Sequence, residues 1–250
     1  MNDDFKILAI DIETSPNVAY TWGLWNQNIS PMTQLIEPGR TICFAAKWIG
    51  SGETMFYSEH RDRDEMIQAV HELMTEADAI MHYNGNKFDL PKLRQELLMA
   101  GMKPPPPSKS IDLMQIVKRQ FGFQSNKLDF VSRELGLAGK VHHSGFDLWK
   151  RCLAGDDEAW AEMEEYNRQD VELLEQLYDI LLPWIPNHPN MNLYVSPDED
   201  VCPNCASTEL TREGYALTAL GKFQRFHCRS CGRWSRSSRR VSGVGTQSAL

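Results

Sequence analysis

The chain has 250 residues, of which 42% are hydrophobic and 24% are charged. This composition is typical of a globular protein and excludes collagen-like and low-complexity classes. No apolar run approaches the roughly 20 residues that a membrane-spanning helix needs, and the N-terminus (MNDDFK) lacks the basic start of a signal peptide. We therefore expect a soluble, cytoplasmic protein without a membrane partner.

The net charge of −8 is distributed unevenly along the chain. The segment from Cys202 to the C-terminus carries a charge of +6, so the preceding residues carry −14. An acidic body with a basic tail indicates that the tail supplies the attraction to a polyanion, although a merely solvated basic tail would show the same charge.

Apolar patterns predict an α/β body. Short apolar runs predict a strand over Lys6–Ile12, a hairpin of Thr41–Ile49 and Glu53–Tyr57 around Gly50-Ser51-Gly52, and a short strand over Ala79–His82. Helical periodicity predicts helices over Asp62–Ala77, Leu90–Ala100, Ile111–Phe121, Leu128–Leu135 and Asp156–Leu182. We expect a mixed sheet flanked by helices.

Three groups of acidic and polar residues stand out along this body. In Asp11-Ile12-Glu13, two carboxylates share one face of a strand end, an arrangement that favours a hard cation such as magnesium or manganese. Asn84-Gly85-Asn86-Lys87-Phe88-Asp89 follows the strand at Ala79–His82. Tyr166 and Asp170 share one face of the last long helix. Taken singly, the three could be a solvated strand end, a helix N-cap and a surface aspartate.

The three motifs in this order resemble the DEDD superfamily of 3′→5′ exonucleases, which have a ribonuclease-H-like fold. Tyr166 places the chain in the branch with tyrosine in the last motif, because Glu165 stands where the other branch has histidine. The proofreading domains of family B DNA polymerases show the same motifs. The resemblance covers roughly the first 180 residues.

This resemblance implies roles for individual residues. Asp11 would bridge two Mg²⁺ or Mn²⁺ ions, Glu13 and Asp170 would complete the site of one ion, and Asp89 would support the other. Two such ions activate a water and stabilise the leaving 3′ oxygen. The catalytic set would therefore be Asp11, Glu13, Asp89, Tyr166 and Asp170. Tyr166 would orient the attacking water, and three further residues would contact the last nucleotides: Thr14, Asn84 and Phe88.

Two Cys-x-x-Cys pairs near the C-terminus, Cys202/Cys205 and Cys228/Cys231, have the spacing of a tetrahedral zinc site. We expect one structural zinc ion that supplies much of the folding energy of a small ribbon. Basic and aromatic residues alternate between the pairs, and Lys222 and Arg225 are candidate nucleic-acid contacts. The stretch from Gly221 to Cys231 resembles the zinc ribbons of transposases. A ribbon of this kind can also dock on protein.

The predicted organisation is an exonuclease domain over 1–186, a linker over 187–200, a zinc ribbon over 201–236 and a disordered tail over 237–250. The predicted function is release of nucleoside monophosphates from 3′ ends, with DNA favoured over RNA, and the chain could proofread in trans for a separate DNA polymerase. Three alternatives stay open: an RNA-trimming exonuclease, an endonuclease on the same fold, and a non-catalytic binding or docking protein.

Overall fold

The computed structural model describes residues 5–139, 144–194 and 200–246. Contacts divide the chain into two compact units. The larger unit holds residues 6–118 and 122–177. Of the described residues, the smaller unit holds Phe5, Arg119–Phe121 and the chain from Tyr178 onward. Within the described residues, no helix is both long enough and apolar enough to cross a membrane.

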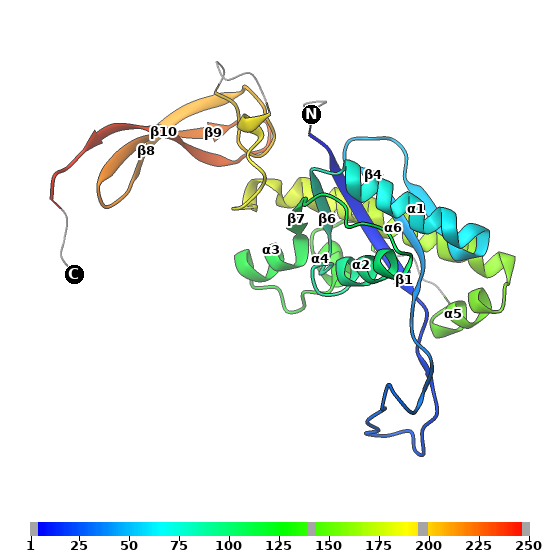
Figure 1. The fold of residues 1–250 in the computed structure, drawn as a ribbon. Helices are drawn as coiled ribbons and strands as arrows, with labels where there is room; N and C mark the ends of the chain where they lie inside the picture. The colour runs from blue at the N-terminus through cyan, green and yellow to red at the C-terminus, as the bar shows by residue number, and fades with distance from the viewer. Residues whose placement is uncertain (1–4, 140–143, 195–199, 247–250) are drawn as a thin grey trace. The chain divides into compact units, whose positions relative to one another are not determined.

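The larger unit is built on a five-stranded mixed sheet with the order β5-β4-β1-β6-β7 (Figure 1). The strands are β1 Ile7–Thr14, β4 Thr41–Trp48, β5 Met55–Ser58, β6 Ala79–His82 and β7 Lys109–Asp112. β1 is central: it pairs antiparallel with β4 along its whole length and parallel with β6 only from Ile7 to Ala9. The end of β1 therefore has no strand partner on the β6 side.

Helices lie on both faces of the sheet. They are α1 Glu59–Glu76, α2 Asp89–Met99, α3 Leu113–Gln120, α4 Leu128–Glu134, α5 Phe146–Leu153 and α6 Asp157–Leu181. α1 and α2 cover one face, where their buried residues join Leu8, Ile10 and Ile12 of β1 in a single hydrophobic core. The side chain of Asp11 points away from that core and accepts a hydrogen bond from Asn167 of α6. α6 therefore lies on the other face of the sheet. The α/β sheet flanked by helices confirms the fold predicted from the sequence.

One local prediction was wrong. Ile111 and Asp112 belong to β7 rather than to a helix, because they pair with Met81 and His82 of β6. Four residues are too few to show a strand period, so the tertiary pairing decides the structure. The helix expected from Asp62 is present, and the Asp62 carboxylate accepts the Glu65 amide at 2.9 Å, although α1 begins with a further turn at Glu59.

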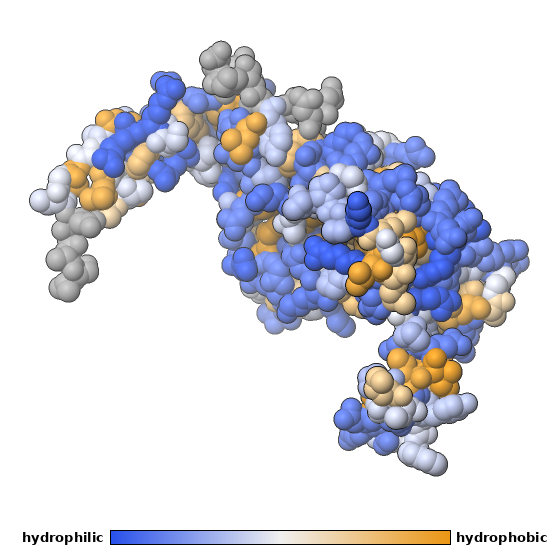
Figure 2. All heavy atoms as spheres, viewed as in Figure 1, coloured by the Kyte–Doolittle hydropathy of each residue, from blue (hydrophilic) through white to orange (hydrophobic). Residues whose placement is uncertain are grey.

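An arm that the sequence did not predict follows β1. β2 (Val18–Ala19) and β3 (Leu35–Glu37) form a short ladder that carries a long loop away from the sheet (Figure 1). The loop exposes large apolar side chains, among them Trp22, Trp25 and Met32, and Figure 2 shows apolar residues gathered on this arm.

The smaller unit contains a three-stranded antiparallel sheet with the order β10-β9-β8. Its strands are β8 Leu210–Leu217, β9 Gly221–Cys228 and β10 Trp234–Gly243, and two 3-10 turns, η1 Leu182–Trp184 and η2 Met191–Leu193, precede them. β10 extends to Gly243, into the segment from residue 237 that was expected to be a disordered tail. β9 offers a free edge with which residues 240, 242 and 243 pair, although their polar sequence shows no strand pattern. Residues 247–250 lie outside the described chain.

The segment expected to be a linker is partly folded. Met191 is buried and its amide donates to the Pro203 carbonyl at 2.9 Å, and the Tyr178 hydroxyl lies 2.7 Å from His188 Nε2. Residues 195–199 of this segment lie outside the described chain. Residues 187–194 therefore belong structurally to the smaller unit.

Candidate nuclease site and cysteine cluster

The end of β1 presents two acids on one face. Ile10 and Ile12 point into the core, so Asp11 and Glu13 point to the opposite face, as strand periodicity requires. The register with β4 shifts between Glu13 and Thr14. Such irregularities are common beside active sites because they redirect side chains.

Asp89 reaches the same strand end from α2. Its Oδ1 accepts a hydrogen bond from the amide of Ile12 at 3.4 Å. This amide lies beyond the last residue of β1 that pairs with β6, so a carboxylate replaces the missing strand partner. Asp89 is therefore anchored between Asp11 and Glu13, which joins the first two sequence motifs in space.

The third motif reaches the site through α6. Asn167 Nδ2 donates to Asp11 Oδ2 at 2.8 Å and lies 3.3 Å from the Asp11 carbonyl oxygen. Tyr166 precedes Asn167 and is buried, with its ring edge-on to Trp149 of α5 at a centroid distance of 6.4 Å. Asp170, one turn later, is only 1% exposed. The structure thus brings all three motifs to one end of β1.

The loop between β6 and α2 is held by a buried histidine. His82 Nδ1 accepts the Gly85 amide at 2.9 Å, and His82 Nε2 lies 2.9 Å from Ser110 Oγ. Burial lowers the pKa of His82, while the charge of Asp112 opposes that effect. A side chain at residue 85 would place its Cβ 2.5 Å from His82 Cγ, so only glycine fits. His82 therefore shapes the loop that leads to Asp89.

Asn84, at the start of this loop, has a left-handed backbone (φ 68°). Its amide donates to Asp112 Oδ1 at 3.0 Å, which fixes this uncommon conformation. Phe88, at the end of the loop, is 44% exposed and is therefore available to a ligand.

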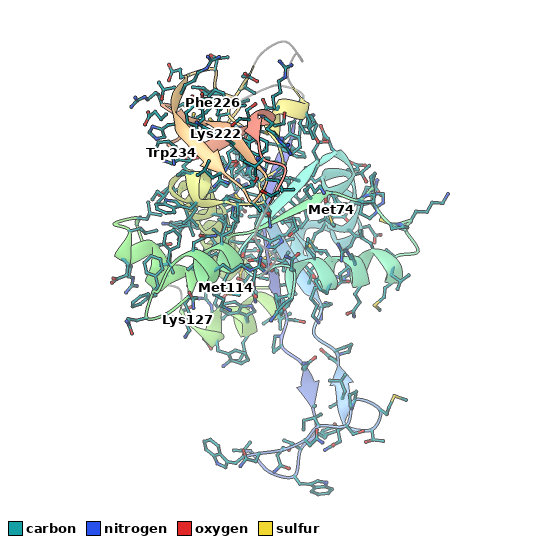
Figure 3. The ribbon with its side chains drawn as sticks, turned by 90° about the vertical axis from the view of Figure 1, so that its left-hand side faces the viewer. Met74, Met114, Lys127, Lys222, Phe226 and Trp234 are labelled. Atoms are coloured by element: carbon teal, nitrogen blue, oxygen red, sulfur yellow. The ribbon has the colours of Figure 1, made fainter. Side chains whose placement is uncertain are left out.

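A cavity of about 580 Å³ opens beside Asn84. Its lining includes Tyr83, Lys118 and Lys127, and Lys127 and Met114 are labelled in Figure 3. The Tyr83 hydroxyl donates to the Asn126 carbonyl at 2.8 Å, which ties the β6 loop to the segment before α4. Two ammonium groups next to an asparagine and a tyrosine suit a phosphate-bearing ligand.

The acids at the end of β1 create a strongly negative environment. Burial raises the pKa of Asp89 to about 6, and the charge of Asp112 acts in the same direction. Burial, followed by the charges of Glu13 and Asp11, raises the pKa of the Cys43 thiol well above its ordinary value. A buried carboxyl group with this bias is held in its charged form by a nearby cation, and carboxylate oxygens are the ligands that Mg²⁺ and Mn²⁺ prefer. The residues therefore fit divalent metal ions.

The geometry of the carboxylates differs from that of the cysteines. Of the described acids, histidines and cysteines, the set whose ligand atoms all lie within 4.8 Å of one another consists of Cys202, Cys205, Cys228 and Cys231. The described acids at and near the end of β1 do not form such a set.

The cysteine cluster has the chemistry of a structural zinc site. Sulfur atoms of Cys202 and Cys231 lie 3.6 Å apart, and those of Cys205 and Cys228 lie 3.7 Å apart. Hydrogen bonds with Cys205 and Cys231 lower the pKa of Cys202, and hydrogen bonds with Cys202 and Cys205 raise the pKa of Cys231, as expected when close thiols share a proton. All four cysteines predicted from the sequence are therefore grouped as one tetrahedral zinc ion requires.

The other predicted contacts are less tightly grouped. Thr14, Asn84 and Phe88 lie on β1 and on the β6–α2 loop, near the acids in the chain. Lys222 and Arg225 lie on β9 but on opposite faces, because they are three positions apart. Sequence reasoning missed Asn167, although it lies inside the quoted motif between Tyr166 and Asp170, and it missed the lysines of the cavity.

Comparison with known proteins agrees with this fold. The sheet order and the acids on its central strand define a ribonuclease-H-like nuclease fold. A family model described as RNase_H superfamily (RNase_H_2) matches residues 8–182, and the chain belongs to this family. Its fold typically uses divalent metal ions, and the family implies a nucleic-acid substrate.

A solved structure shows the same fold in a larger enzyme. The family B DNA polymerase of the hyperthermophilic archaeon Pyrobaculum calidifontis is similar with a TM-score of 0.53 and 21% sequence identity. The match covers 72% of this chain and 25% of the polymerase, so the chain spans about a quarter of that protein. A search of curated proteins finds no match.

Proposed function

We propose that the larger unit is a metal-dependent exonuclease that removes nucleoside monophosphates from 3′ ends, with DNA as its preferred substrate. The observation that carries this proposal is the convergence of three motifs at the end of β1. Asp89 is anchored on the Ile12 amide between Asp11 and Glu13, and α6 reaches Asp11 through Asn167.

In this proposal Asp11, Glu13, Asp89 and Asp170 hold two Mg²⁺ or Mn²⁺ ions. When bound, the ions would supply the charge that activates a water and stabilises the leaving 3′ oxygen. The chain's own groups position the reaction. Asn167 fixes the Asp11 carboxylate, and the hydroxyl of the buried Tyr166 orients the attacking water.

The substrate strand would approach along the β6–α2 loop. Thr14 would lie beside the terminal 3′-hydroxyl, Asn84 beside the last nucleotides, and the exposed Phe88 would stack on a base. Lys118 and Lys127 in the adjoining cavity would neutralise phosphates of the incoming strand. Proofreading in trans for a polymerase carried on another chain is the wider role that we propose.

The experiment that tests this function compares DNA and RNA single strands of one sequence, each labelled at the 5′ end, in the presence of Mg²⁺. We expect a ladder that shortens from the 3′ end, that a 3′ block prevents and that Asp170→Asn abolishes. If RNA were shortened faster than DNA, RNA would be the preferred substrate. Cuts that ignore the 3′ block would make the protein an endonuclease, and intact strands in all conditions would favour a non-catalytic docking protein.

A further inference from the structure

The three-stranded sheet of the smaller unit has two chemically different faces. Residues opposite each other in a ladder share a face. Arg236 pairs with Arg225, Trp234 with His227 and Arg240 with Phe223. One face therefore carries six basic or aromatic residues, which we call the arginine face: Phe223, Arg225, His227, Trp234, Arg236 and Arg240.

Lys222 belongs to the opposite face. Its ammonium group lies 3.9 Å from the centre of the Tyr215 ring, and Tyr215 pairs with Gln224, the next residue on that face of β9. Arg212 pairs with Phe226 and so shares this second face. The two basic residues that the sequence singled out together, Lys222 and Arg225, therefore cannot contact one strand of ligand from the same side.

Stacking orders the guanidinium groups of the arginine face. Arg225 lies 4.7 Å from the centre of the Trp234 ring, and Arg236 lies 4.2 Å from the centre of the Phe223 ring. Trp234 also stacks on His227, with centroids 4.5 Å apart and an interplanar angle of 15°. A stacked guanidinium loses less rotamer freedom when it binds an anion.

The third arginine lies against the backbone itself. A Cβ atom would be 3.0 Å from Arg240 Nε at Gly221 and 2.5 Å from Arg240 Nη1 at Gly243. These two glycines pair with each other across β9 and β10. The glycine pair thus makes room for Arg240 to lie flat on the sheet.

The three arginines of this face are not paired with carboxylates within the described part of the ribbon. Arg225, Arg236 and Arg240 form no salt bridge in the described chain. The nearby carboxylate of Glu213 lies 3.3 Å from Arg229 and 3.6 Å from His227. Like charges directly opposite each other destabilise a sheet. A bound polyanion would therefore reduce the repulsion between the paired Arg225 and Arg236.

We propose that the arginine face binds an unpaired nucleic-acid strand, with Arg225, Arg236 and Arg240 on its phosphates and Trp234 on a base. Trp234 is 44% exposed although His227 and Arg225 lie against its ring, and a base can reach the exposed part of the ring only when the base is free of a duplex. This binding site is separate from the hydrolysis proposed for the larger unit, and it exists whether or not that unit cleaves.

The test measures binding by the full chain carrying Asp170→Asn, so that cleavage does not interfere. A fluorescent oligo-thymidine and its duplex with oligo-adenosine are titrated at several salt concentrations. Arg225→Ala with Arg236→Ala should weaken single-strand binding roughly tenfold or more. The slope of log affinity against log salt should become shallower by about 1.4, the value for two lost phosphate contacts.

The matched control is Arg212→Ala, which removes one charge from the opposite face and should leave affinity and slope unchanged. It is compared with Arg225→Ala and Arg236→Ala made singly, each of which also removes one charge. Zinc content of each variant shows that the ribbon is folded, and Arg240→Ala repeats the test at a third position. Bound oligo-thymidine should also quench tryptophan fluorescence in the parent protein, and Trp234→Phe should remove most of that quenching.

Three outcomes would overturn the proposal. Equal losses from Arg212→Ala and from either single variant, Arg225→Ala or Arg236→Ala, would mean diffuse attraction without a specific face. Tighter binding of the duplex than of the single strand would exclude an unpaired ligand. Unchanged binding in every arginine-face variant would assign the face to a protein partner. None of these outcomes depends on whether the parent protein shortens a 3′ end.

Discussion

Asn167 Nδ2 donates a hydrogen bond of 2.8 Å to Asp11 Oδ2, which ties the last helix of the larger unit to its central strand at the candidate metal site. Asn167 is fully buried, so the bond is shielded from water. The contact makes Asn167 a positioning residue for the carboxylate that would bridge two metal ions.

We therefore expect Asn167→Ala to lower the nuclease rate by about 10- to 100-fold, the usual cost of removing a hydrogen-bond partner from a metal-ligating group. The loss should shrink as Mg²⁺ is raised, because a loosely held Asp11 weakens metal binding. Rates measured over a Mg²⁺ titration check this, with Gln169→Ala as the control on the same helix. If the variant matched the rate of the parent protein at every Mg²⁺ concentration, Asn167 would not be a positioning residue of the site.

The β6–α2 loop offers a prediction about steric fit. Gly85→Ala would place a methyl group 2.5 Å from His82 Cγ, and His82 is fixed by Ser110 on the other side. Overpacking of this kind costs about 1–3 kcal/mol of the free energy of unfolding. It should also slow cleavage, because the loop carries Asp89.

Urea unfolding of Gly85→Ala and Gly52→Ala measures this cost. A Cβ at residue 52 would meet no heavy atom of the described residues within 4 Å, so the Gly52→Ala variant should be as stable as the parent. Equal stability of both variants would show that the loop adjusts without strain.

The same histidine predicts how stability depends on pH. Burial lowers the pKa of His82 below its ordinary value of 6.5, so the unfolded chain takes up a proton at a higher pH than the folded chain does. The contribution of His82 is therefore complete above about pH 6.5 and declines as the pH falls, by up to about 1.4 kcal/mol per pH unit.

Urea unfolding of the parent protein and of His82→Gln between neutral and mildly acidic pH isolates this effect. Glutamine can accept the Gly85 amide and donate to Ser110 without titrating, so the difference in stability should shrink on acidification. A difference that stays constant with pH would show that His82 does not remain neutral in the folded protein.

Local patterns predicted much of this structure. Ala79–His82 was predicted as β6 because its apolar run is short and bounded, and the grouping of the cysteines follows from their spacing alone. The loop between β1 and β4 showed no such pattern, since its apolar residues are exposed. The strand from Trp234 to Gly243 was missed beyond residue 236 because backbone pairing with β9, rather than its own side chains, defines it.

The candidate site was predictable to a different extent. Each acid belongs to a recognisable motif, but the hydrogen bond from the Ile12 amide to Asp89 joins residues 77 positions apart, and no local pattern reports it. The role of Asn167 likewise depends on which face of α6 is buried. The placement of Lys222 and Arg225 on opposite faces could have been predicted once the strand was assigned, because residues an odd number of positions apart lie on opposite faces of a strand.

The cysteine cluster leads to the last prediction, which concerns metal removal. The ribbon has few buried apolar side chains of its own, so zinc should supply most of its folding free energy. Contacts to the chain after α6 help to hold it: Asn204 Nδ2 donates to the Leu182 carbonyl at 2.7 Å, and Arg233 Nη1 donates to the Pro183 carbonyl at 2.9 Å. Both contacts lie within the smaller unit.

We expect one zinc ion per chain in the parent protein and none in Cys228→Ser, whose ribbon should become sensitive to protease between residues 205 and 246. The larger unit has its own core, so its unfolding transition should persist. Zinc content, limited proteolysis and urea unfolding measure the three effects, with Cys152→Ala as a control that should keep its zinc. A Cys228→Ser protein that resists protease as well as the parent does would show that the three-stranded sheet folds without metal, and that the contacts of Asn204 and Arg233 are sufficient to hold it.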